Sequence, residues 1–199
     1  MQRAFSLLAL GITLALTAAQ GPISFAYIKA ADVAKANKDR WSIKGYLDDP
    51  EGEIIASFTE FGLSTGIGIP EGDSADLVTY DPTDCKSLNN DKGLVCKTTG
   101  TRLSFKRTKR VPKGAVIEAQ KNHNKSSSAS SYYTFSGNFR RREFNSSLGT
   151  PLSSGFATNG GAIEGINTKC TEKVGKYTSK YLCKPGTVPT PAPTPASSD

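Results

Sequence analysis

The 199-residue sequence predicts an all-β protein, an antiparallel sandwich or barrel with a short N-terminal helix and two local disulfide hairpins. From residue 41 onward, short β-branched or alternating segments are separated at regular intervals by Gly, Pro, Asn and Asp, which is typical of such folds. In Thr101–Arg107, Leu103 and Phe105 alternate with polar side chains, so one face of that strand is expected to be buried and the other solvated. Four cysteines in two closely spaced pairs are the third observation.

Strands are expected throughout the body of the chain, each bounded by turn-forming residues. The expected strands are Trp41–Leu47, Glu53–Phe61, Leu77–Tyr80, Gly93–Lys97, Thr101–Arg107, Ala115–Gln120, Tyr132–Phe135, Phe139–Phe144, Ala162–Ile166 and Lys176–Cys183. The glycine-rich stretch Leu63–Gly72 has no Lys-Ser ending and no helix after it, so it is read as a glycine-bracketed strand or hairpin edge rather than a phosphate-binding loop. Ser24–Arg40 is alanine-rich, with apolar residues at helical spacing, and is expected to form the N-terminal helix.

The first nineteen residues have the features of a secretory signal peptide. Arg3 supplies a positive charge, Phe5–Leu16 is apolar, and Thr17–Ala19 offers small residues for cleavage. The mature chain is therefore expected to begin near Gln20, or near Tyr27 if the triplet Ser24-Phe25-Ala26 is the cleavage site. The sequence thus divides into a signal peptide (1–19), an N-terminal helical segment (20–40), an all-β domain (41–184) and a disordered Pro/Thr-rich tail (185–199). The expected location is extracellular, and no transmembrane segment is expected.

The four cysteines are expected to form disulfides, because the secretory pathway is oxidising. Each close pair flanks a turn-like segment, which favours pairing Cys85 with Cys96 and Cys170 with Cys183, although four cysteines allow three connectivities. No C-x2-C spacing is present, so zinc is not expected. The acidic residues between positions 73 and 84 lack the spacing of an EF-hand, and no metal or other cofactor is expected.

Charge is distributed unevenly along the chain, whose net charge is +7. Residues 41–91 carry eleven acidic and two basic side chains, whereas residues 101–143 carry eleven basic and two acidic ones. The densest basic clusters supply the candidate anion-binding residues: Lys106, Arg107, Lys109, Arg110, Lys113, Arg140, Arg141 and Arg142.

Three interpretations of this asymmetry are open. The two halves could pair with each other across a sheet, which would give surface ion pairs. The basic half could instead form a face that meets polyanions, and any nucleic-acid binding by it would then be non-specific and steeply dependent on salt. Finally, the dibasic pairs Lys106-Arg107, Lys109-Arg110 and Arg141-Arg142 are of the type that secretory proteases cleave where the backbone is exposed.

Catalytic signatures are sparse. A secreted ribonuclease-like hydrolase would have to use the single histidine, His123, with Glu118 or Glu143 as its partner and Arg102 or Arg140 on the phosphate. No G-x-S-x-G motif supports a serine hydrolase. The first expectation is therefore a protein that is not an enzyme.

Two acceptor sites for N-linked glycans are predicted, at Asn124 and Asn145, both near expected loops. A glycan on Asn124 would crowd His123, which weakens the ribonuclease hypothesis. The Pro/Thr alternation of the tail favours extended polyproline II structure and is typical of O-glycosylated segments.

In overall format, the signal peptide, the four cysteines, the all-β body and the Pro/Thr-rich tail resemble the small secreted, cysteine-containing, effector-like proteins of plant-associated fungi and oomycetes. The resemblance implies a non-enzymatic binding protein that acts outside its producing cell on a host protein or an anionic polymer. It assigns no role to individual residues. The alternatives are the ribonuclease-like hydrolase and, after it, a structural cell-surface or wall-associated protein.

Overall fold

A computed structural model of the chain describes residues 23–49, 51–70, 74–88, 92–108, 132–158, 161–167 and 169–184. These residues form antiparallel strands, one α-helix and one short 3-10 turn. In chain order the elements are β1 (Ile23–Val33), β2 (Asp39–Asp48), α1 (Glu53–Phe61), β3 (Leu63–Gly68), β4 (Ser74–Tyr80), η1 (Pro82–Asp84), β5 (Cys85–Ser87), β6 (Gly93–Thr98), β7 (Thr101–Thr108), β8 (Tyr132–Arg142), β9 (Leu152–Thr158), β10 (Gly161–Asn167), β11 (Lys169–Val174) and β12 (Thr178–Lys184).

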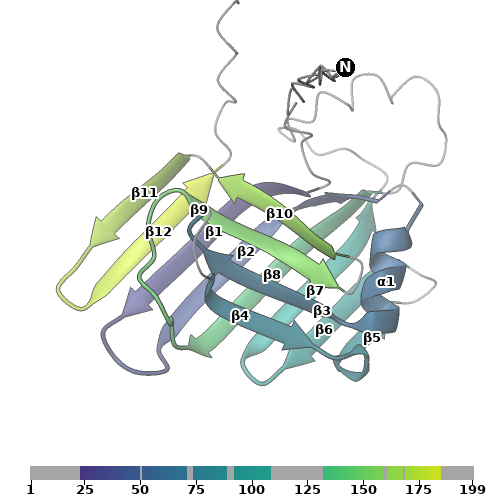
Figure 1. The fold of residues 1–199 in the computed structure, drawn as a ribbon, viewed down its shortest axis with the longest axis horizontal. Coiled ribbons are helices and arrows are strands. Elements are labelled where there is room, and N and C mark those ends of the chain that lie inside the picture. Colours follow the sequence, from purple (N-terminus) through teal and green to yellow (C-terminus); the bar gives the residue numbers. More distant parts are fainter. Residues whose placement is uncertain are drawn as a thin grey trace, which may run out of the picture.

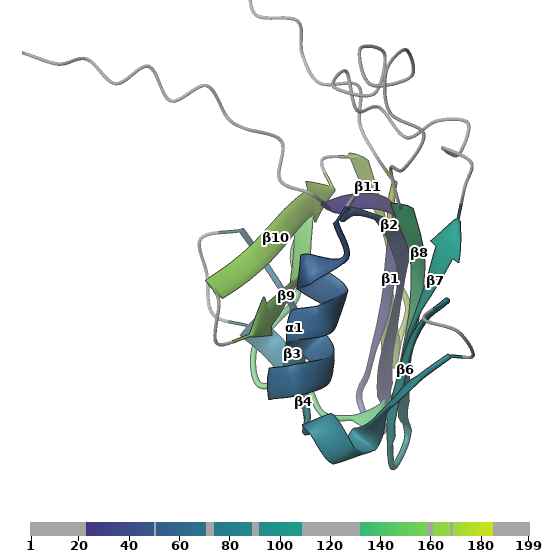
Figure 2. The ribbon, with the colours of Figure 1, turned by 90° about the vertical axis from the view of Figure 1, so that its right-hand side faces the viewer.

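The strands form two sheets. The large sheet has the order β11-β12-β1-β2-β8-β7-β6-β5, and the small sheet has the order β10-β9-β3-β4. Figure 1 shows the small sheet in front of the large one, and Figure 2 shows that α1 and the small sheet lie on the same side of the large sheet. The expected all-β, antiparallel fold is confirmed, and the described sheets are open rather than closed into a barrel.

A cluster of phenylalanine rings holds these layers together. Phe156 of β9 lies with its ring centroid 5.2 Å from Phe105 of β7, 5.0 Å from Phe135 of β8 and 6.0 Å from Phe58 of α1. All four side chains are almost completely buried. Burial of a phenylalanine contributes about 1.5–3 kcal/mol, so this cluster is a main source of stability. It also fixes which face of the large sheet is covered and which remains exposed.

The predicted N-terminal helix is wrong, because residues 23–33 form strand β1. β1 pairs with β12 on one side and with β2 on the other, so its backbone hydrogen bonds are made to neighbouring strands. Alanine favours a helix only weakly, and this central place in a sheet outweighs that preference. Ile28 and Ala30 face the core, whereas Lys29 is exposed, so burial in this part of the strand has a period of two.

The single described helix lies where a strand was predicted, at Glu53–Phe61. Ile55 and Phe58 are its buried residues, at the spacing that places two side chains on one helical face. The carboxylate of Asp49 accepts hydrogen bonds from the backbone N–H groups of Ile54 and Ile55 and so satisfies donors at the start of the helix. No helix in the described ranges is long and apolar enough to cross a membrane.

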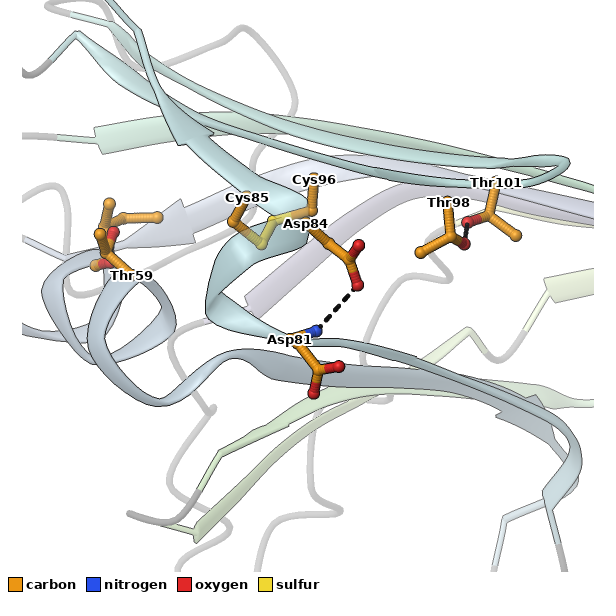
Figure 3. The surroundings of a disulfide bond; sticks show 8 residues. Thr59, Asp81, Asp84, Cys85, Cys96, Thr98 and Thr101 are labelled. Carbon is orange, nitrogen blue, oxygen red and sulfur yellow. Dashed lines mark hydrogen bonds between the residues drawn. A yellow bond between two sulfur atoms is a disulfide. The ribbon is translucent and has the colours of Figure 1, made fainter.

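Both predicted disulfides are confirmed. Cys85 is bonded to Cys96 and Cys170 to Cys183, and in each case the two cysteines lie directly opposite each other on adjacent strands. Because β5 and β11 are the two terminal strands of the large sheet, each disulfide ties an edge strand to its neighbour. Figure 3 shows the first bond beside the η1 turn, where the backbone N–H of Asp81 donates to Asp84 at 3.1 Å.

Candidate functional site

The exposed face of the large sheet carries a high density of basic side chains. Side chains alternate between the two faces of a strand, and residues directly opposite on adjacent strands share a face. The register therefore assigns a set of exposed cations to the face opposite the small sheet, which we call the basic face. Its cations are Lys29, Arg40, Lys44, Lys86, Lys97, Arg102, Lys106, Arg140, Lys169, Lys173, Lys180 and Lys184.

Four of these cations form one line across five neighbouring strands, which we call the cation row. Its positions are, in strand order, Lys173, Lys180, Ala31, Arg40 and Arg140. Neighbouring strands are about 4.8 Å apart, so the row is about 19 Å long. It contains two directly opposed like-charge pairs with Ala31 between them. Opposed like charges destabilise a sheet, so the row carries a local cost in the absence of an anion.

The cation row borders a shallow hollow of about 600 Å³ on strands β12, β1, β2 and β8. The charged residues that line it are Lys29, Arg40, Arg140 and Lys180. Ser42 and Asn138, which are directly opposite each other on β2 and β8, contribute neutral hydrogen-bonding groups. The hollow therefore combines four cations with a hydroxyl and an amide.

The described carboxylates of the acidic half form no ion pair with this face. Among the described strand residues, Asp48 at the end of β2 is the one carboxylate that the register places on it, and no cation of the basic face has an ion pair with a described residue. Other described carboxylates accept hydrogen bonds from backbone N–H groups instead. Asp39, for example, accepts hydrogen bonds from the N–H groups of Val33 at 2.7 Å and Phe144 at 2.8 Å.

One ion pair does join the acidic and basic halves of the sequence. The guanidinium of Arg142 on β8 donates to both carboxylate oxygens of Asp76 on β4, at 2.7 to 3.1 Å, and the indole N–H of Trp41 donates to the same carboxylate at 2.6 Å. The hydrogen bonds to Asp76 raise the pKa of Arg142 above its usual value. Arg142 also donates to the backbone oxygen of Leu77 at 3.1 Å, so it ties the edge of the small sheet to the large one.

The basic residues predicted as one anion-binding group therefore separate in the structure. Lys106 and Arg140 lie on the basic face, whereas Arg142 is held inside by Asp76. Arg107 lines a different hollow, beside α1, and Arg141 is an exposed residue with a φ of 58°. The remaining predicted members lie outside the described residues: Lys109, Arg110 and Lys113.

Three cations of the hollow were not predicted, namely Lys29, Arg40 and Lys180. Lys29 and Arg40 fall in the segment that was expected to be helical, and this interpretation concealed their position on a sheet. Lys180 is more than 130 residues from either of them in the sequence. The alternation of Ile28, Lys29 and Ala30 is the local signal that could have identified β1 as a strand.

Most of the other predicted sites lie outside the part of the chain that the structure describes. His123, Asn124, the signal peptide and the Pro/Thr-rich tail lie outside the described residues, so the hypotheses that rest on them stay predictions. Asn145 is exposed, as a glycan acceptor must be, and its glycosylation also stays a prediction. The described residues contain no cluster of side chains suited to a metal ion.

Tyr80 is an unusual buried polar residue away from the basic face. Its side chain is 1% exposed, and its hydroxyl makes no hydrogen bond within the described part of the chain. Burial raises the pKa of Tyr80 to about 12. The Thr101 hydroxyl acts in the opposite direction, but it already shares a 2.6 Å hydrogen bond with Thr98. The buried phenol is therefore expected to affect the stability of the fold, and none of the described residues around it indicates a ligand.

Comparison with known proteins adds no family to this description: no family model, curated protein or solved structure matches the chain.

Proposed function

We propose that this is a secreted, effector-like binding protein without catalytic activity, whose basic face takes up an anionic polymer outside the producing cell. The observation that carries the proposal is the cation row, in which two opposed like-charge pairs on one exposed sheet face have no carboxylate partner among the described residues. A bound polyanion would supply the missing negative charge.

The physical gain on binding has two parts. Each cation that contacts an anionic group releases a counterion from the polymer, and this release gives affinity that falls steeply with salt. The anion would also relieve the repulsion between Arg40 and Arg140 and between Lys173 and Lys180. The rigid sheet presents these cations without a large ordering cost, because their backbone is already fixed by the neighbouring strands.

An extracellular site of action is supported by the two disulfides, which are typical of oxidising compartments. The predicted signal peptide points in the same direction. Expression of the full-length sequence in a secreting eukaryotic host tests this part, because the protein should be recovered from the medium with an N-terminus near Gln20. Retention in the cell with Met1 intact would contradict it.

The binding proposal is tested by titrating the secreted protein with fluorescent heparin, as a model polyanion, at several salt concentrations. The test variant is Arg40→Gln/Arg140→Gln, which removes two charges from the cation row. The matched control is Lys92→Gln/Arg107→Gln, which removes the same charge near the β6–β7 end of the sheet. Each lost contact should lower the slope of log affinity against log salt by about 1, so the test variant should lose about 2 and the control none.

Two results would contradict the proposal. One is the absence of measurable heparin binding by the unmodified protein at low salt. The other is an equal loss of affinity in both variants, because affinity would then follow net charge rather than the basic face. Incubation of the same protein with RNA tests the ribonuclease alternative, since cleavage that is lost in His123→Ala would favour the enzyme.

A further inference from the structure

We infer that the polymer for which the cation row is built is a sulfated, carboxylate-bearing polysaccharide rather than a nucleic acid. The inference rests on the proposed function and adds the chemical class of the partner. It follows from the grouping of the charges in the cation row and from two properties of the hollow on β12, β1, β2 and β8. These are its neutral polar groups and the lack of an open aromatic ring among its lining residues.

The charges of the row are grouped in pairs. Lys173 and Lys180 are adjacent, Arg40 and Arg140 are adjacent, and the buried Ala31 separates the two pairs. With strands about 4.8 Å apart, the centres of the two pairs are about 14 Å apart. A sulfated polysaccharide carries several anionic groups on one repeat unit, whereas a nucleic acid carries one charge per nucleotide. Paired cations match the former, and the planar guanidinium of arginine suits the oxygens of sulfate or carboxylate.

The neutral groups of the hollow suit a chain that also carries hydroxyl groups. Ser42 and Asn138 lie directly opposite each other, one position along from Arg40 and Arg140 on the same face. The amide of Asn138 can both donate and accept hydrogen bonds, as can the hydroxyl of Ser42. Sugar hydroxyls between anionic groups would satisfy them, whereas a bare phosphate chain would leave them to water.

Aromatic rings are not available in the hollow for stacking on bases. Trp41, Phe139 and Tyr181 contribute to its lining, but their side chains are 2%, 0% and 6% exposed because they point into the core. Proteins that bind single-stranded nucleic acid rely on such rings. Tyr27 lies outside the hollow on β1, and the ammonium of Lys29 already covers its ring, 4.4 Å from the centroid.

The test compares three polymers at matched charge concentration in competition with fluorescent heparin: unlabelled heparin, polyuridylate and inorganic polyphosphate. Heparin should be the strongest competitor by about ten-fold or more, and its advantage should grow with salt, because hydrogen bonds to sugar hydroxyls are screened less than ionic contacts. The variant Ser42→Ala/Asn138→Ala should weaken heparin binding about five- to ten-fold, the size expected for two hydrogen bonds, and leave polyphosphate binding unchanged.

The matched control is Ser136→Ala, which removes a hydroxyl from the same face outside the hollow and should change neither affinity. Equal competition by all three polymers, or preferential binding of polyuridylate, would overturn the polysaccharide inference while the proposed function stands. An equal effect of Ser42→Ala/Asn138→Ala on heparin and polyphosphate would also overturn it. Failure of every polymer to bind would overturn the proposed function itself.

Discussion

Replacement of Arg142 by Met removes the ion pair that joins the two sheets while it keeps most of the aliphatic packing. The carboxylate of Asp76 would then retain one described donor, the indole N–H of Trp41. Its side chain is 5% exposed, against 27% for that of Arg142, so water has little access to the charge left behind. The substitution should therefore act chiefly by leaving a buried carboxylate without its cation.

The expected loss of unfolding free energy is about 3 kcal/mol. Breaking a buried ion pair by removal of one partner costs about 3–5 kcal/mol, and the partial exposure of Arg142 places this pair at the lower end. The loss of the hydrogen bond to the oxygen of Leu77 acts in the same direction. With a urea dependence of about 2 kcal/mol per M, the unfolding midpoint should fall by about 1.5 M.

Urea unfolding followed by the fluorescence of Trp41 and by circular dichroism measures this change. The matched control is Arg140→Met, two residues earlier on the same strand, where the arginine is exposed and has no described ion pair. That variant should change stability by less than about 0.5 kcal/mol. A loss below about 1 kcal/mol in Arg142→Met, or equal losses in both variants, would refute the argument that this pair ties the sheets together.

Three further changes test the account of stability. Tyr80→Phe should stabilise the protein by about 1 kcal/mol at neutral pH, because it removes a buried hydroxyl without a described partner. With a pKa of about 12 for Tyr80, the native state keeps a proton that the unfolded chain releases near pH 10. The free energy of unfolding should therefore fall between pH 10 and 12 in the unmodified protein, and fall less in Tyr80→Phe. Parallel pH dependences of the unfolding free energy, measured with urea, would contradict this. Burial, and to a smaller extent the charge of Asp39, raises the pKa of the Asp32 carboxyl. Ionisation of Asp32 therefore lowers the stability of the folded protein as the pH rises. Asp32→Asn should raise the melting temperature at pH 7 but not at pH 3. Phe156→Ala should lose about 3–5 kcal/mol in urea unfolding, because its ring contacts those of three other phenylalanines, and a loss below about 1 kcal/mol would show that the cluster is not the centre of the core.

Local patterns were sufficient for much of the fold. The alternation in 101–107 predicted strand β7, and the turn-like segments between the cysteines predicted both disulfides. These features depend on residues that are near one another in the sequence. Two expected strands, Tyr132–Phe135 and Phe139–Phe144, proved to belong to the single strand β8, which ends at Arg142, because Gly137 between them continues the ladder. A Cβ at position 137 would lie 2.6 Å from the ring of Phe139, which is why glycine fits there.

Sequence patterns were misleading where tertiary contacts decide the outcome. Alanines suggested a helix in the first described segment, although its two neighbouring strands make it part of a sheet. α1 was taken for a strand, although two residues near it are signals of helix ends. Asp49, three residues before the N-cap Gly52, accepts hydrogen bonds from the first turn, and Gly62 follows the helix with a φ of 74°. Local sequence patterns do not show which strands pair with one another or in what register, and this pairing decides both outcomes.

The candidate site shows this most clearly. The cluster Arg140–Arg142 is continuous in the sequence, yet Arg140 faces solvent and Arg142 lies against Asp76. The pairing of β2 with β8 shifts its register at this point, and the extra residue, Arg141, places Arg140 and Arg142 on opposite faces of the sheet. Lys180, Arg40 and Arg140 become neighbours only through the pairing of β12, β1, β2 and β8. A basic sequence cluster thus indicated that a charged surface exists, and the strand order determined which cations share it.

The central claim is that the exposed face of the large sheet is the binding surface, and nuclear magnetic resonance with a sulfated oligosaccharide tests it most directly. In a titration of the isotope-labelled protein, the account predicts that the side-chain N–H signals of Arg40 and Arg140 and the backbone amides around Lys29 and Lys180 shift together and saturate. The Arg142 side-chain signal should stay fixed, because Asp76 already holds that guanidinium. Shifts confined to Arg107 and α1, or the absence of any saturable shift at low salt, would contradict the claim.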